Sequence, residues 1–87
     1  MKKTARWQRG DWKKRSYQYK GEWRVAEGYE MDFLLDGRMQ ASFIAVPDFK
    51  NSVFKLRGCI VMKYADYVPK TRELPFGQEG KNFEIDV

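Results

Sequence analysis

The residues of this chain that are best suited to chemistry lie near its N-terminus, where lysine and arginine alternate with aromatic side chains. Lysine and arginine neutralise phosphates and release their counterions. Aromatic rings stack on exposed bases of any sequence, which favours RNA or single-stranded DNA over a closed duplex. The pattern therefore predicts a nucleic-acid-binding segment. Its candidate residues are Arg6, Trp7, Arg9, Trp12, Lys13, Lys14, Arg15, Tyr17, Tyr19 and Lys20.

The cations and the rings of this segment have separate expected roles. Tyr17 and Tyr19 would share one face of a strand and form a stacking platform, because successive side chains of a strand point to opposite faces. Stacking is expected from Trp7, Trp12, Tyr17 and Tyr19. Phosphate contacts are expected from Arg6, Arg9, Lys13, Lys14 and Arg15.

The charge of the chain is as uneven as its aromatic content. The sequence has 87 residues, of which 17 are basic and 12 acidic, and its formal net charge is +5. Residues 1–24 hold nine basic and two acidic residues, a net charge of +7, so residues 25–87 carry −2. All three tryptophans, Trp7, Trp12 and Trp23, also lie in residues 1–24. The nucleic-acid hypothesis depends mainly on this coincidence of charge and rings.

The same composition supports a second class of function. Tryptophan, tyrosine and arginine are also the residues that dominate protein–protein hot spots. The chain would then be a small inhibitor or adaptor, of the kind that phages and other mobile elements encode, which docks on a larger nucleic-acid-processing machine. We expect Trp7 and Trp12 to be the most exposed aromatic side chains. Trp23 is expected in the core, because Val25 continues its face.

The chain lacks the residues that most forms of catalysis need. The chain has one cysteine and no histidine, which excludes an ordinary zinc site and a histidine-assisted nucleophile. There is no Walker loop and no dinucleotide fingerprint. We therefore expect a protein that is not an enzyme and has no cofactor or metal. No apolar run is long enough to span a membrane, so we expect a cytoplasmic protein, with Cys59 as a small buried residue. The sequence leaves the oligomeric state open.

One pattern is similar to the P-D…E-x-K signature of a family of metal-dependent nucleases. It consists of Pro47-Asp48 followed by Glu79-Gly80-Lys81. In that family the acids hold Mg²⁺ and the lysine orients water. Here the Pro-Asp pair falls in a predicted turn and E-x-K in a glycine-flanked loop, where the family has a central strand. We therefore rank a nuclease third, behind the two binding hypotheses.

The elements that must position these residues are strands. The pattern predicts a single, mostly β domain over residues 1–87, a small antiparallel barrel or strongly bent sheet of about five strands, SH3-like or OB-like. Residues 1–14 show no clean period and are expected to form a basic arm or loop-rich lead-in, and residues 15–87 the β core. From Tyr17 the pattern has period two, and Lys20-Gly21 interrupts it with a bulge or a tight turn.

The clearest predicted element is a hairpin over residues 29–46. A two-residue Asp36-Gly37 loop would pair polar with apolar residues on both faces. A three-residue loop, 35–37, places Phe33 opposite Met39, with apolar residues paired throughout. Since register follows the buried face, we predict the three-residue loop, a type I turn followed by a G1 bulge at Gly37.

The second half of the chain is predicted to hold two further strands. Residues 53–64 are apolar on both faces in their middle, which indicates the central and best-buried strand, with a bend or bulge at Gly58. Residues 64–67 are expected to form one helical turn at most. Residues 66–81 are mostly irregular, and alternating Phe83, Ile85 and Val87 predict a short final strand.

Overall fold

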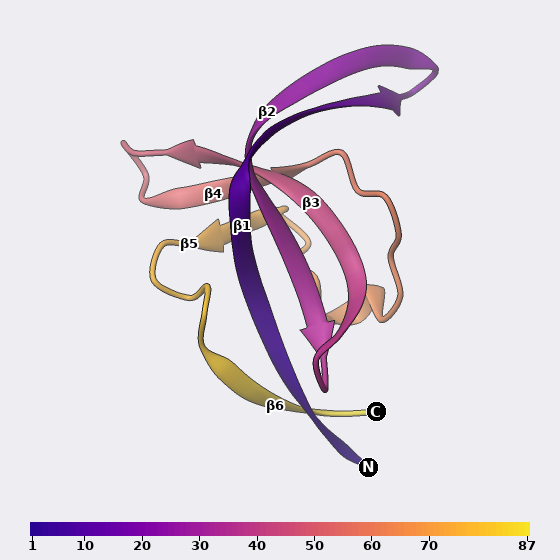
Figure 1. The fold of residues 1–87 in the computed structure, drawn as a ribbon, viewed down its shortest axis with the longest axis vertical. Coiled ribbons are helices and arrows are strands. Elements are labelled where there is room, and N and C mark those ends of the chain that lie inside the picture. Colours follow the sequence, from indigo (N-terminus) through magenta and orange to yellow (C-terminus); the bar gives the residue numbers. More distant parts are fainter.

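The computed structural model describes residues 1–87, which form six strands and one short 3₁₀ helix (Figure 1). Two long strands dominate the chain, and four shorter ones follow. The strands are β1 (Lys2–Tyr19), β2 (Glu22–Leu35), β3 (Arg38–Asp48), β4 (Val53–Arg57), β5 (Glu73–Pro75) and β6 (Asn82–Asp86). The 3₁₀ helix η1 spans Ala65–Tyr67, which confirms the expected single helical turn.

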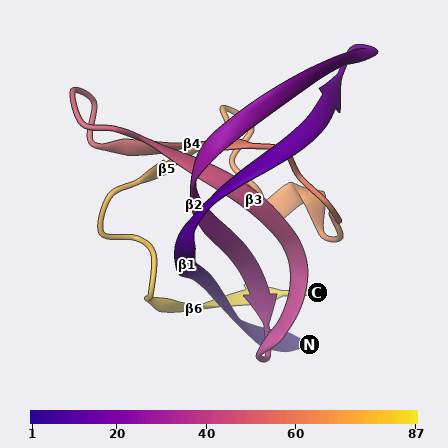
Figure 2. The ribbon, with the colours of Figure 1, turned by 45° about the horizontal axis from the view of Figure 1, so that its top comes forward.

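All six strands belong to one antiparallel sheet in the order β5-β4-β3-β2-β1-β6. The sheet is strongly twisted and curls into a half-barrel, with the β1–β2 hairpin reaching beyond its upper end (Figures 1 and 2). The prediction of a mostly β fold with a strongly bent antiparallel sheet is therefore confirmed. The sixth strand is β5, which is only three residues long and lies in the segment expected to be irregular.

The expected arm at residues 1–14 is wrong, because these residues belong to β1. Ala5 and Trp7 are fully buried on one face of β1, and the strand pairs with β2 on one side and with β6 on the other. The register then shifts between Arg9 and Trp12, where the extra residue of a β-bulge lies. A bulge exchanges the two faces of a strand. The side of β1 that continues the face of Trp7 therefore changes from odd to even numbers, beginning with Trp12 opposite Tyr29, which hid the period in the sequence.

The β2–β3 hairpin has a different register from the predicted one. Its loop is the two residues Asp36-Gly37, with φ of 48° and 77°, as a type I′ turn requires. Pairing begins with Leu35 opposite Arg38, and a register shift at Gln40 then brings Phe33 opposite Ala41. Apolar residues do pair with apolar residues, as expected, but a bulge inside β3 achieves this rather than a longer loop.

The predicted strand over residues 53–64 is confirmed for Val53–Arg57, as is the bend at Gly58, but its continuation to residue 64 is wrong. β4 ends at Arg57, because Gly58 adopts a left-handed φ of 58° and turns the chain. β4 lies between β3 and the edge strand β5. Residues 59–64 instead run beside β3, where the Ile60 and Lys63 amides donate to the carbonyls of Ser42 and Gln40. Ile60, Val61 and Met62 are exposed, and so is Cys59, which corrects its expected burial.

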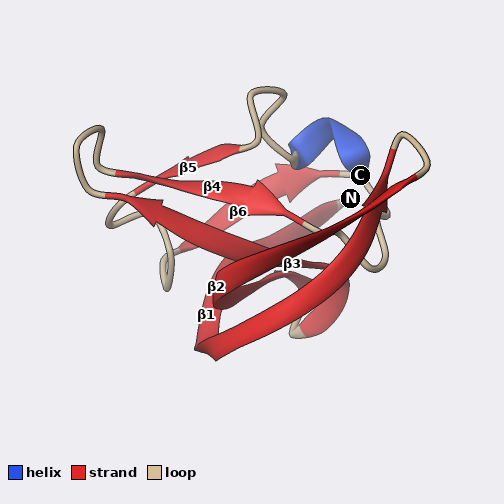
Figure 3. Ribbon diagram, turned by 90° about the horizontal axis from the view of Figure 1, so that it is seen from above, coloured by secondary structure: helices blue, strands red, loops and turns tan.

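The core fills the concave face of the half-barrel. Trp7 lies at its centre, with its ring centroid 5.0 Å from that of Phe33 and 6.0 Å from that of Phe43. Ile85 supplies the contribution of β6, as the predicted final strand requires. Val68, directly after η1, is buried in the same cluster, and the Tyr67 hydroxyl donates to the Asp86 carbonyl. Figure 3 shows η1 beside the chain termini at this end of the sheet.

None of the helical structure approaches the length and hydropathy needed to cross a lipid bilayer.

Candidate functional site

The β1–β2 hairpin continues well beyond the rest of the sheet. Pairing between β2 and β3 stops at Tyr29 opposite Ala45, whereas β1 and β2 pair on to Tyr19 opposite Glu22. We call residues 13–28 the hairpin arm (Figure 2). Its tip is Lys20-Gly21, with φ of 51° and 80°, a type I′ turn. The tight turn that the sequence suggested at this dipeptide is therefore confirmed.

The register of the arm assigns its side chains to two faces. Tyr17 lies opposite Arg24, and these two share a face with Arg15 and Tyr19. Gln18 lies opposite Trp23, on the other face. Arg15 and Tyr17 lie within about 3.5 Å of where a Cβ on Gly58 would stand. The face that carries Arg15, Tyr17, Tyr19 and Arg24 is called the inner face, since it is the one that contacts the body of the protein.

Arg15 fastens the root of the arm to the body. Its Nη1 donates to the carbonyls of Ser42, at 2.9 Å, and Gly58, at 2.8 Å. Its Nη2 donates to Ser42 Oγ at 3.0 Å and lies 3.5 Å from a Glu30 carboxylate oxygen. The side chain is only 14% exposed. Nearly all of its hydrogen-bonding capacity is used inside the protein, so its main role is structural.

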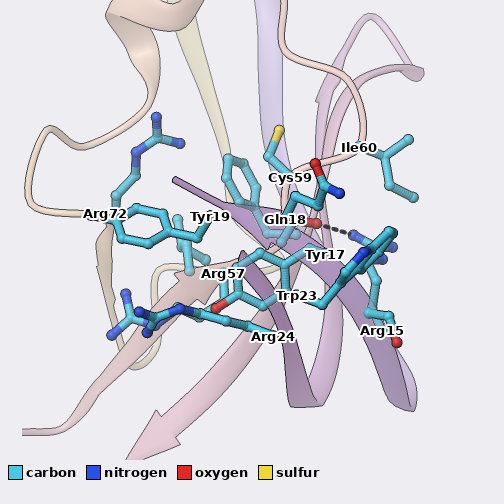
Figure 4. A pocket seen from close by; sticks show the side chains of 14 residues that line it. Arg15, Tyr17, Gln18, Tyr19, Trp23, Arg24, Arg57, Cys59, Ile60 and Arg72 are labelled. Carbon is cyan, nitrogen blue, oxygen red and sulfur yellow. Dashed lines mark hydrogen bonds between the residues drawn. The ribbon is translucent and has the colours of Figure 1, made fainter. Parts of the chain in front are cut away.

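A groove of ≈ 900 Å³ opens between the arm and the segment after β4. Its lining combines arginine with aromatic side chains, and no acidic residue is part of it. Figure 4 shows Arg24 and Arg57 extending to the lower left, away from Arg15, whereas the Arg72 side chain points to the upper left. The charged and aromatic lining residues are Arg15, Tyr17, Tyr19, Trp23, Arg24, Phe43, Arg57 and Arg72.

Two of the four arginines have no acidic partner. Arg24 lies 3.6 Å from Glu22, a pair in which both side chains are more than half exposed. Arg57 makes no ion pair or side-chain hydrogen bond, whereas Arg72 lies over the Phe43 ring at 5.6 Å and near the Met62 sulfur. Arg57 and Arg72 therefore leave the groove with uncompensated positive charge.

Two of the aromatic lining residues, Tyr19 and Trp23, lie in the part of the groove nearest the tip of the arm. Tyr19 has Arg24 over its ring at 5.0 Å and Lys20 at 5.4 Å. Trp23 is 71% exposed. It lies at the rim of the groove, because it belongs to the face of the arm opposite to the inner face. The Trp23 ring is therefore open to solvent, whereas the Tyr19 ring already has two cations over it.

Cys59 also lines the groove, and its thiol donates to the Val61 carbonyl at 3.1 Å. Partial burial raises the pKa of the Cys59 thiol above its ordinary value, although Arg72 and Arg15 act in the opposite direction. A raised pKa means a small thiolate fraction at neutral pH.

The structure gathers only part of the predicted segment. Arg15, Tyr17 and Tyr19 line the groove, and Lys20 stands at the tip of the arm. Trp7 is only 1% exposed and lies in the core, which corrects its expected exposure. Trp23, which was expected in the core, is 71% exposed. The expectations for Trp7 and Trp23 are therefore both wrong.

The remaining predicted residues lie outside the groove. Trp12 is 51% exposed and packs edge-on against Tyr29, whose ring also contacts Arg9 at 4.7 Å. Arg6 donates to Gln8 and Asn82 near β6. Lys13 and Lys14 pair with Glu30 and Glu27.

Five of the charged and aromatic groove residues were missing from the predicted set, namely Trp23, Arg24, Phe43, Arg57 and Arg72. Arg24 and Trp23 follow from the register once Lys20-Gly21 is taken as a two-residue turn, since it places Arg24 opposite Tyr17. Arg57 and Arg72 lie far along the chain, and the hydrogen bond from the Leu56 amide to the Arg72 carbonyl, at 2.7 Å, joins the two backbone segments that carry them. No local pattern indicates that contact.

The residues of the nuclease-like pattern have local partners. Asp48 accepts hydrogen bonds from the Asn51 backbone and side chain and pairs with Lys55 at 3.6 Å. The bond from the Asn51 side chain is the main reason that the pKa of Asp48 lies below its ordinary value. Glu79 accepts from the Gly77 amide. Both carboxylates thus stabilise turns.

Comparison of the chain with protein-family models, with curated proteins and with solved structures finds no match to any of them.

Proposed function

We propose that the protein is a non-enzymatic nucleic-acid-binding module that holds RNA or single-stranded DNA in the groove between the hairpin arm and the body. One observation carries the proposal, a ≈ 900 Å³ groove lined by four arginines and several aromatic rings, with no acidic side chain in its lining. The proposed residues differ from those expected from the sequence, since the groove lies nearer the tip of the arm than most of the expected segment does.

The arginines supply the electrostatic part of the interaction. Guanidinium groups bind phosphate oxygens through two parallel hydrogen bonds and keep their charge at any physiological pH. Arg57 and Arg72 have no acidic partner to release before they bind a phosphate. Association should therefore weaken with salt, as it does for proteins that displace counterions from nucleic acid.

The rings supply the preference for unpaired bases. Tyr17, Tyr19 and Trp23 line the groove beside its arginines. Stacking of a base on an aromatic ring contributes about 1–3 kcal/mol and tolerates any sequence, but it requires a base whose face is free. A closed duplex does not offer that face, so single strands should bind more tightly than duplexes of the same sequence.

The test is a fluorescence titration of the tryptophans with a mixed-sequence, single-stranded ten-nucleotide DNA at several salt concentrations. Trp23 should be quenched, whereas Trp7 is shielded in the core. In the double variant Arg57→Ala/Arg72→Ala, binding should weaken. The slope of log affinity against log salt should fall by about 1.4, the value for two charges on a single strand.

The matched control is Arg38→Ala/Lys81→Ala, which removes the same charge from exposed sites without ion pairs, outside the groove. If the control lowers the slope as much as the groove variant does, net charge rather than the groove governs binding. If the unmodified protein shows no quenching at low salt, the proposal is wrong.

A second candidate function, a protein-binding inhibitor or adaptor, is favoured by the outer face of the arm. Trp23 and Val25 both project from that face and are 71% and 65% exposed. Exposed apolar side chains on a protruding element are typical of interaction surfaces. Val25→Asp leaves the groove lining unchanged. It should abolish capture of a partner from nuclease-treated extract if this function is correct, and have no effect on oligonucleotide binding.

A further inference from the structure

The hairpin arm has two backbone edges, and neither is paired with another strand. On the side of β1 away from β2, β6 pairs only with Lys2 to Arg6, and the Gly80 amide donates to the Trp7 carbonyl. Figure 1 shows β6 at the lower end of β1 and the arm at its upper end. We call the free edge of β1 over residues 12–18 the β1 edge. The other edge of the arm is open because β3 leaves β2 at Tyr29.

The register of the arm shows which backbone groups the β1 edge presents. Tyr19 and Glu22 close a two-residue turn, and the two residues that close such a turn exchange both backbone hydrogen bonds. Hydrogen-bonded pairs alternate along an antiparallel ladder, so the amides of Tyr17 and Arg15 also point to β2. The amides and carbonyls of the even-numbered residues therefore point outward, and no segment outside the arm bonds to them. These exposed residues are Lys14, Ser16 and Gln18.

An edge of this kind is a template for an added strand. Main-chain hydrogen bonds supply the affinity in such recognition, and alternate side chains supply the specificity. Proteins usually protect an edge by making it short, by a bulge, by proline or by charged side chains. Residues 12–18 contain no proline, and their pairing with β2 is regular beyond the bulge. Of these devices, the β1 edge uses only charge.

The sign of that charge selects the partner. Lys13, Lys14 and Arg15 follow one another, and no acidic residue lies between Trp12 and Lys20. Two copies of the chain paired along this edge would bring two such basic runs together, and like charges on neighbouring strands are destabilising. A strand that carries carboxylates meets the opposite condition. The β1 edge therefore disfavours a second copy and favours an acidic segment.

Lys14 is the side chain best placed to meet a carboxylate. It belongs to one of the residues whose backbone points outward, and its side chain is 69% exposed. Its ammonium lies 3.9 Å from the Glu27 carboxylate, a weak and exposed ion pair that an incoming strand can replace. The opposite edge of the arm carries Glu22 and Glu27 beside Arg24, so it offers no comparable run of one sign.

We infer that the β1 edge binds an extended acidic segment of a partner protein as an additional strand of the sheet. The segment pairs its backbone with Lys14, Ser16 and Gln18 and places a carboxylate beside the Lys14 ammonium. This interaction uses the backbone edge of the arm rather than the arginines of the groove, so it does not depend on the proposed nucleic-acid function.

The probe is an octapeptide of alternating glutamate and valine with blocked ends, added to isotope-labelled protein. Binding should slow hydrogen exchange of the Lys14, Ser16 and Gln18 amides by at least about tenfold, because each gains a partner. The amides of Arg15 and Tyr17, which already bond to β2, should change less. The same peptide with every amide N-methylated keeps its charge and side chains but has no backbone donor, and it should not bind.

Two proline variants test the two edges of the arm separately. Ser16→Pro removes an outward amide from the β1 edge, and Val25→Pro does the same directly opposite, on the other edge. Ser16→Pro should weaken peptide binding at least about tenfold, and Val25→Pro less than about twofold. Circular dichroism checks that both remain folded. If Ser16→Pro unfolds, the N-methylated peptide gives the same decision on the unmodified protein.

A charge reversal tests the preference for carboxylates. In Lys14→Glu, a peptide of alternating lysine and valine should bind more tightly than the glutamate peptide, since the sign of the edge is changed. Lys81→Glu changes the net charge equally at an exposed site outside the arm, and it should retain the original preference.

Each other result decides against the inference in a different way. Equal binding of the methylated and unmodified peptides shows that charge alone holds them and overturns strand addition. Absence of binding, or protection confined to the amides of the opposite edge, overturns it as well. A dimer that protects the same amides without peptide assigns the β1 edge to a second copy. None of these results bears on binding of a single strand in the groove, which the oligonucleotide titration tests.

Discussion

Trp7 and Trp23 show how one residue type serves opposite purposes in this chain. Trp7 is 1% exposed and packs against Phe33 and Phe43, whereas Trp23 is 71% exposed at the rim of the groove. Burial of an aromatic ring is a major source of stability, so an unburied tryptophan contributes little to the fold. The structure thus separates a structural tryptophan from one that is available to a ligand.

The first prediction concerns these two tryptophans. Trp7→Ala should lower the free energy of unfolding by about 3–5 kcal/mol, because it leaves a large cavity in the core. Trp23→Ala should change it by no more than about 0.5 kcal/mol, as expected for an exposed residue. Urea unfolding followed by circular dichroism measures both. Comparable losses in the two variants would contradict this assignment of core and surface.

The sequence misassigned these two residues for a physical reason. Trp7 and Trp12 stand five residues apart, which places them on opposite faces of a regular strand. The bulge after Arg9 inserts a residue and restores them to one side. Without knowledge of the bulge, neither the strand nor the burial of Trp7 follows. The interleaving of cations and rings did correctly point to Arg15, Tyr17 and Tyr19 as neighbours of one surface.

At the level of the elements, the hairpin arm begins where β2 parts from β3, next to Gly28. A Cβ on Gly28 would overlap the backbone of Ala45, in particular its carbonyl oxygen. Only glycine lets β2 pass this close to β3 before the arm turns away. A Cβ added to Gly10, which lies next to the bulge, would stand 3.5 Å from Glu30, an ordinary contact distance.

The second prediction follows from this contrast. Gly28→Ala should destabilise the fold by more than about 1 kcal/mol, because a backbone neighbour has to move. It should also weaken oligonucleotide binding by displacing the arm from Gly58. Gly10→Ala should be close to neutral. Thermal unfolding and tryptophan quenching of both variants provide the measurement. Equal losses of stability and of binding in the two variants would refute the close approach of β2 to β3 at Gly28.

The elements themselves were predictable to different degrees. Asp36-Gly37 and Lys20-Gly21 identify two turns, because both positions of a type I′ turn need positive φ. Alternation identifies β6. The bulge at Gln40 changes the register of β3, and no glycine marks its position in the sequence. The predicted pairing was therefore wrong. Residues 59–64 are apolar enough for a central strand, yet they lie exposed beside β3. Tertiary contacts rather than β propensity decide such cases.

At the scale of the whole molecule, one concave core serves all six strands. β1 and β6 carry Ala5, Trp7 and Ile85 into it, and the Tyr67 hydroxyl links the 3₁₀ helix to β6. The groove depends on the same framework, because its arginines come from β1, β2, β4 and the segment before β5. The arrangement of these arginines around the groove depends on the complete sheet. No local pattern in the sequence therefore indicates that Arg57 and Arg72 line it.

The third prediction is that the sheet does not fold stably without its last strand, β6. Removal of residues 82–87 deletes Ile85 from the core and leaves the edge of β1 unpaired from Lys2 to Arg6. The shortened protein should lose cooperative unfolding and aggregate, since an open edge is a template for other chains. Glu84→Ala, which removes only an exposed ion pair with Lys2, should behave like the parent. Calorimetry and size-exclusion chromatography distinguish these outcomes.

The pairing of β6 with β1 has a consequence for biosynthesis. A ribosome adds about 5–20 residues per second, so residues 82–86 follow residues 2–6 by roughly 4–16 s at that rate. During this interval the nascent β1 can already form its hairpin with β2, but its other edge has no partner. The growing chain therefore passes through a stage in which Lys2, Lys3 and Arg6 are the main protection of that edge, because their like charges repel the same strand of a neighbouring nascent chain.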